Sequence, residues 1–208
     1  MPEAQVPVTR VLIAEDQGMV RGALAALLSL EPDIEVVCEV ADGARVVAAA
    51  QDVQPDVCLL DIEMPGADGL TVAAALRRAL PRCRVIILTT FGRPGYLRRA
   101  LDAGAAGYLL KDAPSTDLAV AIRRVRAGER VVAPDLAIAA LSLGETPLSP
   151  RETEILAAAR SGRSIAQLAA ALHLSEGTVR NHLSAAIQKL GARNRAEAAG
   201  IAEEKGWL

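Results

Sequence analysis

The sequence predicts an α/β domain on a doubly wound parallel sheet, followed by a small all-α domain. Up to residue 127, short apolar runs alternate with longer segments whose apolar residues recur at helical spacing. This alternation is typical of a parallel sheet covered by helices on both faces. Beyond residue 147 only helical signals remain. The chain has 208 residues, 51% of them hydrophobic, which is enough for two cores.

The first domain is predicted to contain five strands, each followed by a helix. The strands cover residues 8–14, 34–40, 57–61, 84–88 and 107–110. The helices cover residues 17–30, 43–53, 69–80, 94–103 and 114–127, with Asp68 as a cap and Pro94 at a first helical position. We expect the strand order 2-1-3-4-5 of a five-stranded doubly wound sheet. The predicted divisions are a domain at 1–127, a linker at 128–147 with a short apolar helix near 136–143, and a domain at 148–208.

The second domain opens with a strong helix signal. Ser149-Pro150-Arg151-Glu152 has the form of a capping box with proline at the first helical position. Ser164 and Gln167 form a second capping box, and Asn194 is a third cap. The expected helices cover residues 150–161, 165–172, 177–190 and 195–204. Two short helices joined by a tight turn, with one helix before and one after, fit a helix-turn-helix unit.

Composition excludes several classes of protein. No apolar run approaches the ~18 residues of a membrane span, and no basic segment precedes an apolar run at the N-terminus, so we expect a cytoplasmic protein without membrane contact. The net charge of −2 does not by itself indicate nucleic acid, although residues 145–208 carry a net charge of +1. Cys38, Cys58 and Cys83 lie in or beside strand-like runs, without CxxC spacing or a nearby histidine, which favours buried thiols over metal ligands or disulfides.

Polar residues stand at the ends of four predicted strands. They are Glu15-Asp16, Asp61, Thr89 and Lys111. In a doubly wound sheet these ends converge at one edge, where three carboxylates could hold Mg²⁺ and Asp61 could act as a nucleophile toward a phosphoryl group. Lys111 would neutralise a phosphoryl oxygen, and Thr89 would donate a hydrogen bond to another. Taken alone, Asp61 would be interpreted as a helix cap or a hydrated loop residue; the set of residues favours the site.

Residues 8–127 resemble the receiver domain of two-component response regulators. The resemblance rests on Glu15-Asp16, Asp61, Thr89, Tyr108 and Lys111. It implies phosphotransfer from a sensor histidine kinase to Asp61, dependence on Mg²⁺, and a switch formed by Thr89 and Tyr108. Asp112 follows Lys111 where many receivers have proline, so the peptide geometry at that position stays open. We expect no enzyme, but a phosphoacceptor with at most slow loss of its own phosphoryl group.

The third helix of the second domain has two distinct faces. An apolar stripe comprises Val179, Leu183, Ala186, Ile187 and Leu190, whereas a polar face carries Arg180, Asn181, Ser184 and Gln188. Arginine can read guanine and asparagine adenine in a major groove, and Thr178 at the helix start could bind phosphate. Arg180 and Asn181 alone would favour a solvated face of an ordinary bundle helix.

Residues 145–208 resemble the DNA-binding domain of the NarL/FixJ family with a LuxR-type helix-turn-helix. The motifs are Leu148 to Glu152, Gly177 to His182, and Lys189-Leu190-Gly191. The resemblance implies that Arg180, Asn181 and Ser184 face the DNA bases. Lys189 either contacts phosphate or pairs with an acid in the bundle, His182 contacts phosphate or packs, and His173 is expected to be structural.

Further stretches resemble a subgroup that controls desaturase genes for membrane lipids. They are residues 14–17, 61–66, 89–96 and 204–207.

One short recognition helix reads few base pairs, so we expect a homodimer on paired half-sites of double-stranded DNA. Phosphorylation would promote this dimer, and RNA polymerase is a candidate partner. One candidate dimer surface is the face around the helices at 94–103 and 114–127. The favoured one pairs the first and fifth helices through Val20, Ala23, Leu24 and Leu27 and through Leu118, Ala121, Ile122 and Val125; the alternative is that these side chains are all core.

Two alternative functions compete with a phosphorylation-controlled regulator. An aspartate-nucleophile phosphatase uses similar chemistry, but it needs its nucleophile on the first strand and a second acid two residues later; here Asp61 is on the third strand and Glu63 holds that position. A ligand-sensing LuxR-type regulator would share the second domain but lack an acidic pocket in the first.

Overall fold

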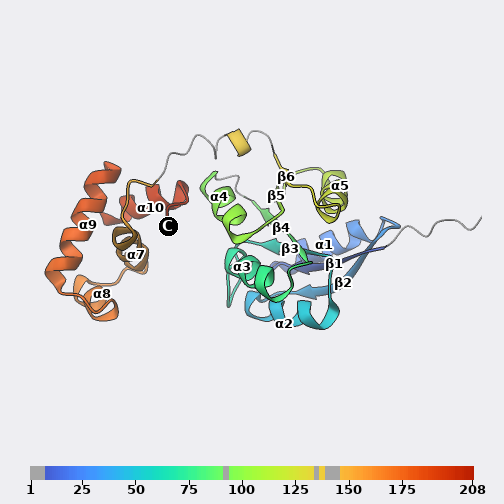
Figure 1. Ribbon diagram of the computed structural model, residues 1–208, viewed down its shortest axis with the longest axis horizontal. Helices are drawn as coiled ribbons and strands as arrows, with labels where there is room; N and C mark the ends of the chain where they lie inside the picture. The colour runs from blue at the N-terminus through green and yellow to red at the C-terminus, as the bar shows by residue number, and fades with distance from the viewer. Residues whose placement is uncertain (1–7, 91–93, 134–135, 139–145) are drawn as a thin grey trace, which may run out of the picture. The chain divides into compact units, whose positions relative to one another are not determined.

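The computed structural model describes residues 8–90, 94–133, 136–138 and 146–208 (Figure 1). They form an α/β unit and an all-α unit, each with its own hydrophobic core.

The α/β unit is built on a parallel sheet. Its strands are β1 (Thr9–Ala14), β2 (Ile34–Val40), β3 (Val57–Asp61), β4 (Arg84–Thr89) and β5 (Gly107–Leu110). They pair in the order β2-β1-β3-β4-β5, which confirms the predicted topology. A sixth strand, β6 (Val131–Val132), extends the sheet beside β5. It lies in the segment predicted to be linker. The prediction missed this strand because a run of two apolar residues is too short to indicate one.

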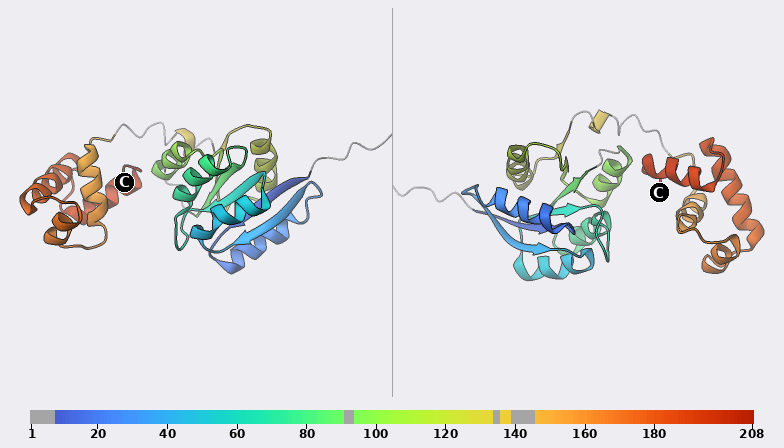
Figure 2. Two further views of the ribbon diagram at one scale, coloured as in Figure 1. Left: turned by 60° about the horizontal axis from the view of Figure 1, so that its bottom comes forward. Right: turned by 180° about the vertical axis from the view of Figure 1, so that it is seen from behind.

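Helices cover both faces of this sheet. Helices α1 (Gly18–Leu28) and α5 (Ser115–Arg126) lie on one face, and α2 (Gly43–Val53) and α3 (Gly69–Ala79) on the other (Figure 1). Figure 2 shows the strands between the two layers. Because successive strand residues point to opposite faces, Val11, Ile13 and Leu59 pack with α1 and α5 in one continuous core. Helix α4 (Pro94–Ala103) follows β4.

The all-α unit has the four expected helices. They are α7 (Pro150–Ala159), α8 (Ile165–Ala171), α9 (Glu176–Leu190) and α10 (Arg195–Glu204). Both predicted capping boxes form: Ser149 caps α7 with Glu152, and Ser164 caps α8 with Gln167. Of the short helix expected near 136–143, residues 136–138 are helical, and residues 139–143 lie outside the described part of the chain.

The apolar stripe of α9 holds this unit together. Val179, Leu183 and Ala186 are buried against α7, α8 and α10, with Ile187 and Leu190 packed at the margin. The opposite face of α9 is therefore left for solvent or a ligand. Across the described residues, no helix has the length and apolar character needed to cross a bilayer.

Candidate functional site

The strand ends of the α/β unit bring the predicted residues together. Asp61 closes β3 and is 5% exposed, and Glu15 follows β1 and is 1% exposed. The ammonium of Lys111, just after β5, lies 3.0 Å from Asp61 Oδ2 and 2.7 Å from Glu15 Oε2. Lys111 therefore bridges the two buried carboxylates.

Burial and charge shift the pKa values of this group. Burial raises the pKa of Glu15 above its ordinary value, against the lowering effect of its bond with Lys111. Burial alone would lower the pKa of Lys111, but hydrogen bonds to Glu15 and Asp61 outweigh it and raise that pKa. Lys111 therefore stays protonated beside Asp61 at neutral pH.

Three carboxylates of this edge are placed to hold a cation. Glu15, Asp16 and Asp61 each offer an oxygen, and these oxygens lie within 4.8 Å of one another. Glu15 Oε2 is buried, and its contact is the Lys111 ammonium at 2.7 Å. With three carboxylates and one ammonium, the cluster keeps net negative charge. This donor set fits Mg²⁺, which when bound would offset the repulsion between an incoming phosphoryl group and Asp61.

Thr89 and Tyr108 belong to adjacent strands. Thr89 ends β4 and is 5% exposed, whereas Tyr108 in β5 is fully buried. The backbone N–H of Lys111 donates to the carbonyl of Thr89 at 2.8 Å, which ties the ends of β4 and β5 together.

The phosphatase alternative involves Glu63, the acid two residues after Asp61. Glu63 is exposed and is not among the three clustered carboxylates.

Gly69 is a site residue that the sequence did not reveal. It is the first residue of α3, and a Cβ atom there would lie 2.0 Å from the carbonyl oxygen of Asp61. Its N–H donates to the carbonyl of Ile62 at 3.0 Å. Asp68, as predicted, caps the helix by accepting from the N–H of Thr71. Gly69 thus allows backbone-to-backbone packing that fixes the position of Asp61. The short loop between β3 and α3 was the one feature of the sequence that indicated a close approach of the two elements at Gly69.

The polar face of α9 is accessible in the all-α unit. Arg180, Asn181 and Ser184 are exposed, and Thr178 is half-buried at the helix start. Ser175 caps the helix by accepting from the N–H of Thr178 at 3.0 Å. The guanidinium of Arg180 pairs with Glu176 one turn earlier, at 2.7 Å, and so lies along the exposed face.

The structure favours one of the two interpretations of Lys189. Its ammonium lies 2.7 and 3.0 Å from the two carboxylate oxygens of Glu152, which is 6% exposed. The pair lowers the pKa of Glu152, with a smaller effect from the Ser149 backbone N–H. Lys189 therefore joins α9 to the capping box of α7. His173 is exposed and has a left-handed backbone (φ +54°) in the turn after α8, and its expected structural role stays a prediction.

Comparison with known proteins matches a family model to each of the two parts of the chain. Residues 11–123 match the response regulator receiver domain, and residues 146–202 match bacterial regulatory proteins of the luxR family. The chain is a two-component response regulator with a LuxR-type helix-turn-helix domain. The receiver match excludes the ligand-sensing alternative, which required a different first domain.

Two relatives from Bacillus subtilis (strain 168) are similar along almost the whole chain. The uncharacterized transcriptional regulatory protein YvfU is 51% identical, covering 96% of this chain and 99% of that protein. The transcriptional regulatory protein DesR is 48% identical, covering 95% and 98%. A solved structure of two RcsB dimers bound to two parallel DNAs has 26% identity and a TM-score of 0.68, covering 95% of this chain and 98% of that one.

Proposed function

We propose that the chain is a phosphorylation-controlled transcription factor whose receiver accepts a phosphoryl group on Asp61 from a sensor histidine kinase. The observation that carries the proposal is the position of Asp61, buried at a strand end with Lys111 Nζ at 3.0 Å and two more carboxylates beside it. Asp61 Oδ attacks phosphorus, and Lys111 and Thr89 stabilise the phosphoryl oxygens. The partners are the kinase and double-stranded DNA, which places the action in the cytoplasm.

A small phosphodonor tests this assignment without the kinase. Incubation with acetyl phosphate and Mg²⁺ should add the mass of one phosphoryl group to wild type, and peptide mapping should locate it at Asp61. Asp61→Asn should stay folded and gain no mass. Joint neutralisation of Glu15 and Asp16 by Glu15→Gln and Asp16→Asn should weaken Mg²⁺ binding and slow the reaction together. A phosphoryl group on Asp61→Asn would refute the assignment.

Reading DNA is the second part of the proposal. The exposed residues Arg180, Asn181 and Ser184 contact bases, and Thr178 contacts phosphate at the start of α9. Lys189 contributes by holding α9 on α7 through Glu152. One such helix reads few base pairs, so two copies bind paired half-sites.

The surface that pairs the two copies is proposed to centre on α1. Met19 is 90% exposed, Leu27 41% and Leu30 78%, and Val120 of α5 is 48% exposed. The α5 residues first assigned to this surface, Leu118, Ala121, Ile122 and Val125, are buried in the core, because they form the stripe by which α5 packs on the sheet. The revised surface therefore comprises α1 and the outer side of α5.

A small groove connects this surface to the pocket. About 100 Å³ in volume, it is lined by Val20, Leu24 and Leu27 of α1 and by Lys111, among other residues. Lys111 thus borders both Asp61 and the α1 surface. Phosphorylation of Asp61 is proposed to promote dimerisation by repositioning Lys111 and the chain leading into α5.

Sedimentation with and without beryllofluoride, a phosphoryl mimic, tests the surface. Wild type should dimerise with the mimic, and Val20→Asp should remain monomeric while still accepting phosphate on Asp61. Asp52→Ala on α2, the opposite face of the sheet, is the control. Dimerisation of a folded Val20→Asp protein would reject the α1 surface but leave the phosphoacceptor assignment intact.

The most specific part of the proposal concerns which genes the protein controls. The resemblance to the desaturase-controlling subgroup suggests membrane-lipid genes. The identities to YvfU and DesR, 51% and 48%, are nearly equal, so similarity does not choose between their targets. Genome-wide binding of the phosphorylated protein tests this directly, and RNA polymerase recruitment can be measured at the promoters it finds.

A further inference from the structure

Two cysteines meet at the end of the sheet opposite the acidic pocket. Cys58 is the second residue of β3 and pairs in register with Val85 of β4. Cys83 precedes Val85 by two residues, so both thiols project from the same face of the sheet. Their sulfur atoms lie 3.5 Å apart.

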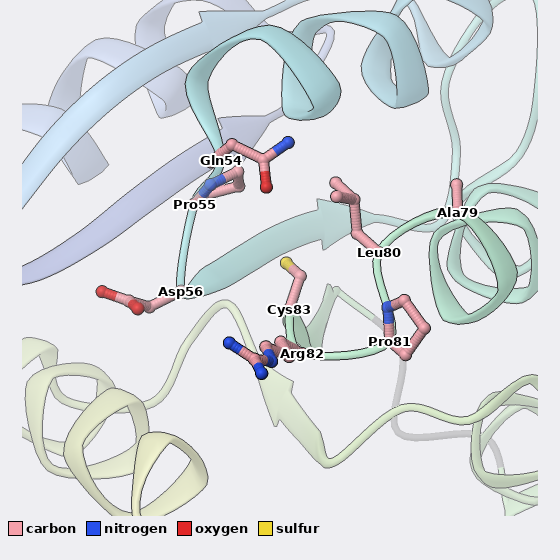
Figure 3. A pocket seen from close by; sticks show the side chains of 8 residues that line it. All are labelled: Gln54, Pro55, Asp56, Ala79, Leu80, Pro81, Arg82 and Cys83. Atoms are coloured by element: carbon pink, nitrogen blue, oxygen red, sulfur yellow. The ribbon is translucent and has the colours of Figure 1, made fainter.

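The two thiols differ in access. Cys58 is completely buried, whereas Cys83 is 9% exposed and lines an open pocket of about 460 Å³. Figure 3 shows its sulfur pointing toward the middle of this pocket, which Gln54, Pro55, Leu80 and Pro81 also line. A molecule as small as a hydroperoxide can therefore reach Cys83 but not Cys58.

The thiols also differ in acidity. The hydrogen bond to Cys58 lowers the pKa of Cys83, and the same bond, together with burial, raises the pKa of Cys58. Of the two thiols, the accessible one therefore ionises more readily. Thiolates are the nucleophilic form of cysteine.

We propose that Cys83 and Cys58 form a peroxide-reactive dithiol that closes to a disulfide between β3 and β4. The Cys83 thiolate attacks a hydroperoxide oxygen; an S–O bond forms, the O–O bond breaks, and hydroxide or alkoxide leaves as sulfur is oxidised to the sulfenic acid. The sulfur of Cys58 then attacks Cys83; an S–S bond forms, the S–O bond breaks, and water leaves with the proton of Cys58.

The local backbone permits the second step. A disulfide needs sulfur atoms about 2.05 Å apart, so the pair must close by roughly 1.5 Å. Cys58 is fixed within the ladder of β3, but Cys83 lies one residue before β4, in a turn where its N–H donates to the carbonyl of Leu80 at 3.0 Å. Movement of this turn brings the sulfurs together without disturbing the pairing of β4.

Peptide mapping after peroxide treatment tests the proposal on the full-length protein. Native protein is exposed to hydrogen peroxide at neutral pH, quenched, alkylated under denaturing conditions and digested without reductant. We expect two of the three thiols to disappear, a linked peptide pair containing Cys58 and Cys83, and recovery of both thiols with dithiothreitol. Cys38 should remain alkylated. Loss of Cys38 alone, a link between chains, or three intact thiols in native protein would each overturn the inference.

Single variants separate the two steps. Cys58→Ser should leave Cys83 as a sulfenic acid that dimedone traps, and Cys83→Ser should protect Cys58 from oxidation. Cys38→Ser is the matched control and should form the same linked peptide as wild type. Because serine could disturb the core at Cys58, the wild-type map and the Cys38→Ser map decide the outcome by themselves. Rapid oxidation of Cys58 in Cys83→Ser would show that the roles are wrong.

Discussion

Removing the ammonium of Lys189 should destabilise the DNA-binding domain without removing a DNA contact. Lys189→Met keeps the methylene stem but leaves Glu152, with 7% of its side chain exposed, bonded to the Ser149 N–H alone. Hydrogen bonds to charged groups contribute about 1.5–3 kcal/mol. The Lys189 side chain is 40% exposed, so solvent screens part of the pair and the expected loss is near the lower end, about 1.5 kcal/mol.

Urea unfolding followed by tryptophan fluorescence measures this loss. Trp207 is the single tryptophan of the chain and packs on the core of the DNA-binding domain, so its signal reports that domain. With a slope of about 1 kcal/mol per M urea for so small a domain, the midpoint should fall by roughly 1.5 M. Arg193→Met, which removes the exposed pair with Glu197, is the control and should leave the midpoint unchanged.

The stability difference should depend on pH in one direction. The folded-state pKa of Glu152 is depressed below its ordinary value of 4.5, so the stabilisation is complete above that value. It is lost as pH falls through the folded pKa, where wild type and Lys189→Met should converge. A difference that grows below pH 4.5 would contradict the ion pair.

DNA binding distinguishes the structural role from a phosphate contact. A lost phosphate contact would reduce the slope of log affinity against log salt by about 0.9. We expect an unchanged slope for Lys189→Met under conditions where the domain is folded. A reduced slope with an unchanged urea midpoint would refute the reasoning and restore Lys189 as a phosphate ligand.

Two further predictions concern the recognition helix and the phosphoacceptor. Arg180→Ala should weaken specific binding by about 1–3 kcal/mol and relax the preference at one base position; an equal loss on all sequences would make Arg180 a phosphate contact. Gly69→Ala should cost about 1–3 kcal/mol of receiver stability and slow phosphorylation of Asp61, because its Cβ would lie 2.0 Å from the Asp61 carbonyl oxygen. Gly22→Ala, whose Cβ would meet no atom within 4 Å, is the control, and equal phosphorylation rates in the two variants would reject the positioning role of Gly69.

Local signals predicted most of the fold. Both capping boxes could be predicted because a reciprocal cap depends on residues three positions apart, as with Ser149 and Glu152. The strand-end residues could be predicted because each ends its own apolar run, and parallel topology then brings them to one edge. The end of α1 was predicted two residues too late: the helix stops at Leu28, and Leu30, which extends the apolar spacing, is 78% exposed.

What the sequence could not predict depends on register and tertiary packing. The approach of Cys58 to Cys83 requires both the pairing of β3 with β4 and the turn before β4. The partner of Lys189 lies 37 residues away in another helix, so sequence alone left its role open. Gly69 needed the close approach of α3 to β3, which is a property of the folded backbone.

The position of Lys111 offers a physical link between the proposed phosphorylation of Asp61 and the α1 surface. Phosphorylation shifts a conformational equilibrium only by the difference in its interactions with the two states. Before phosphorylation, Lys111 is shared between Glu15 and Asp61, and its backbone N–H is bonded to Thr89. The proposed phosphoryl group on Asp61 would add charge and oxygen acceptors at the point where this ammonium ends, so Lys111 would redistribute its contacts. The same residue lines the groove against α1, and α5 begins only four residues later at Ser115. The change in charge and the α1 surface thus meet at a single side chain, and no longer chain of contacts is needed to link them.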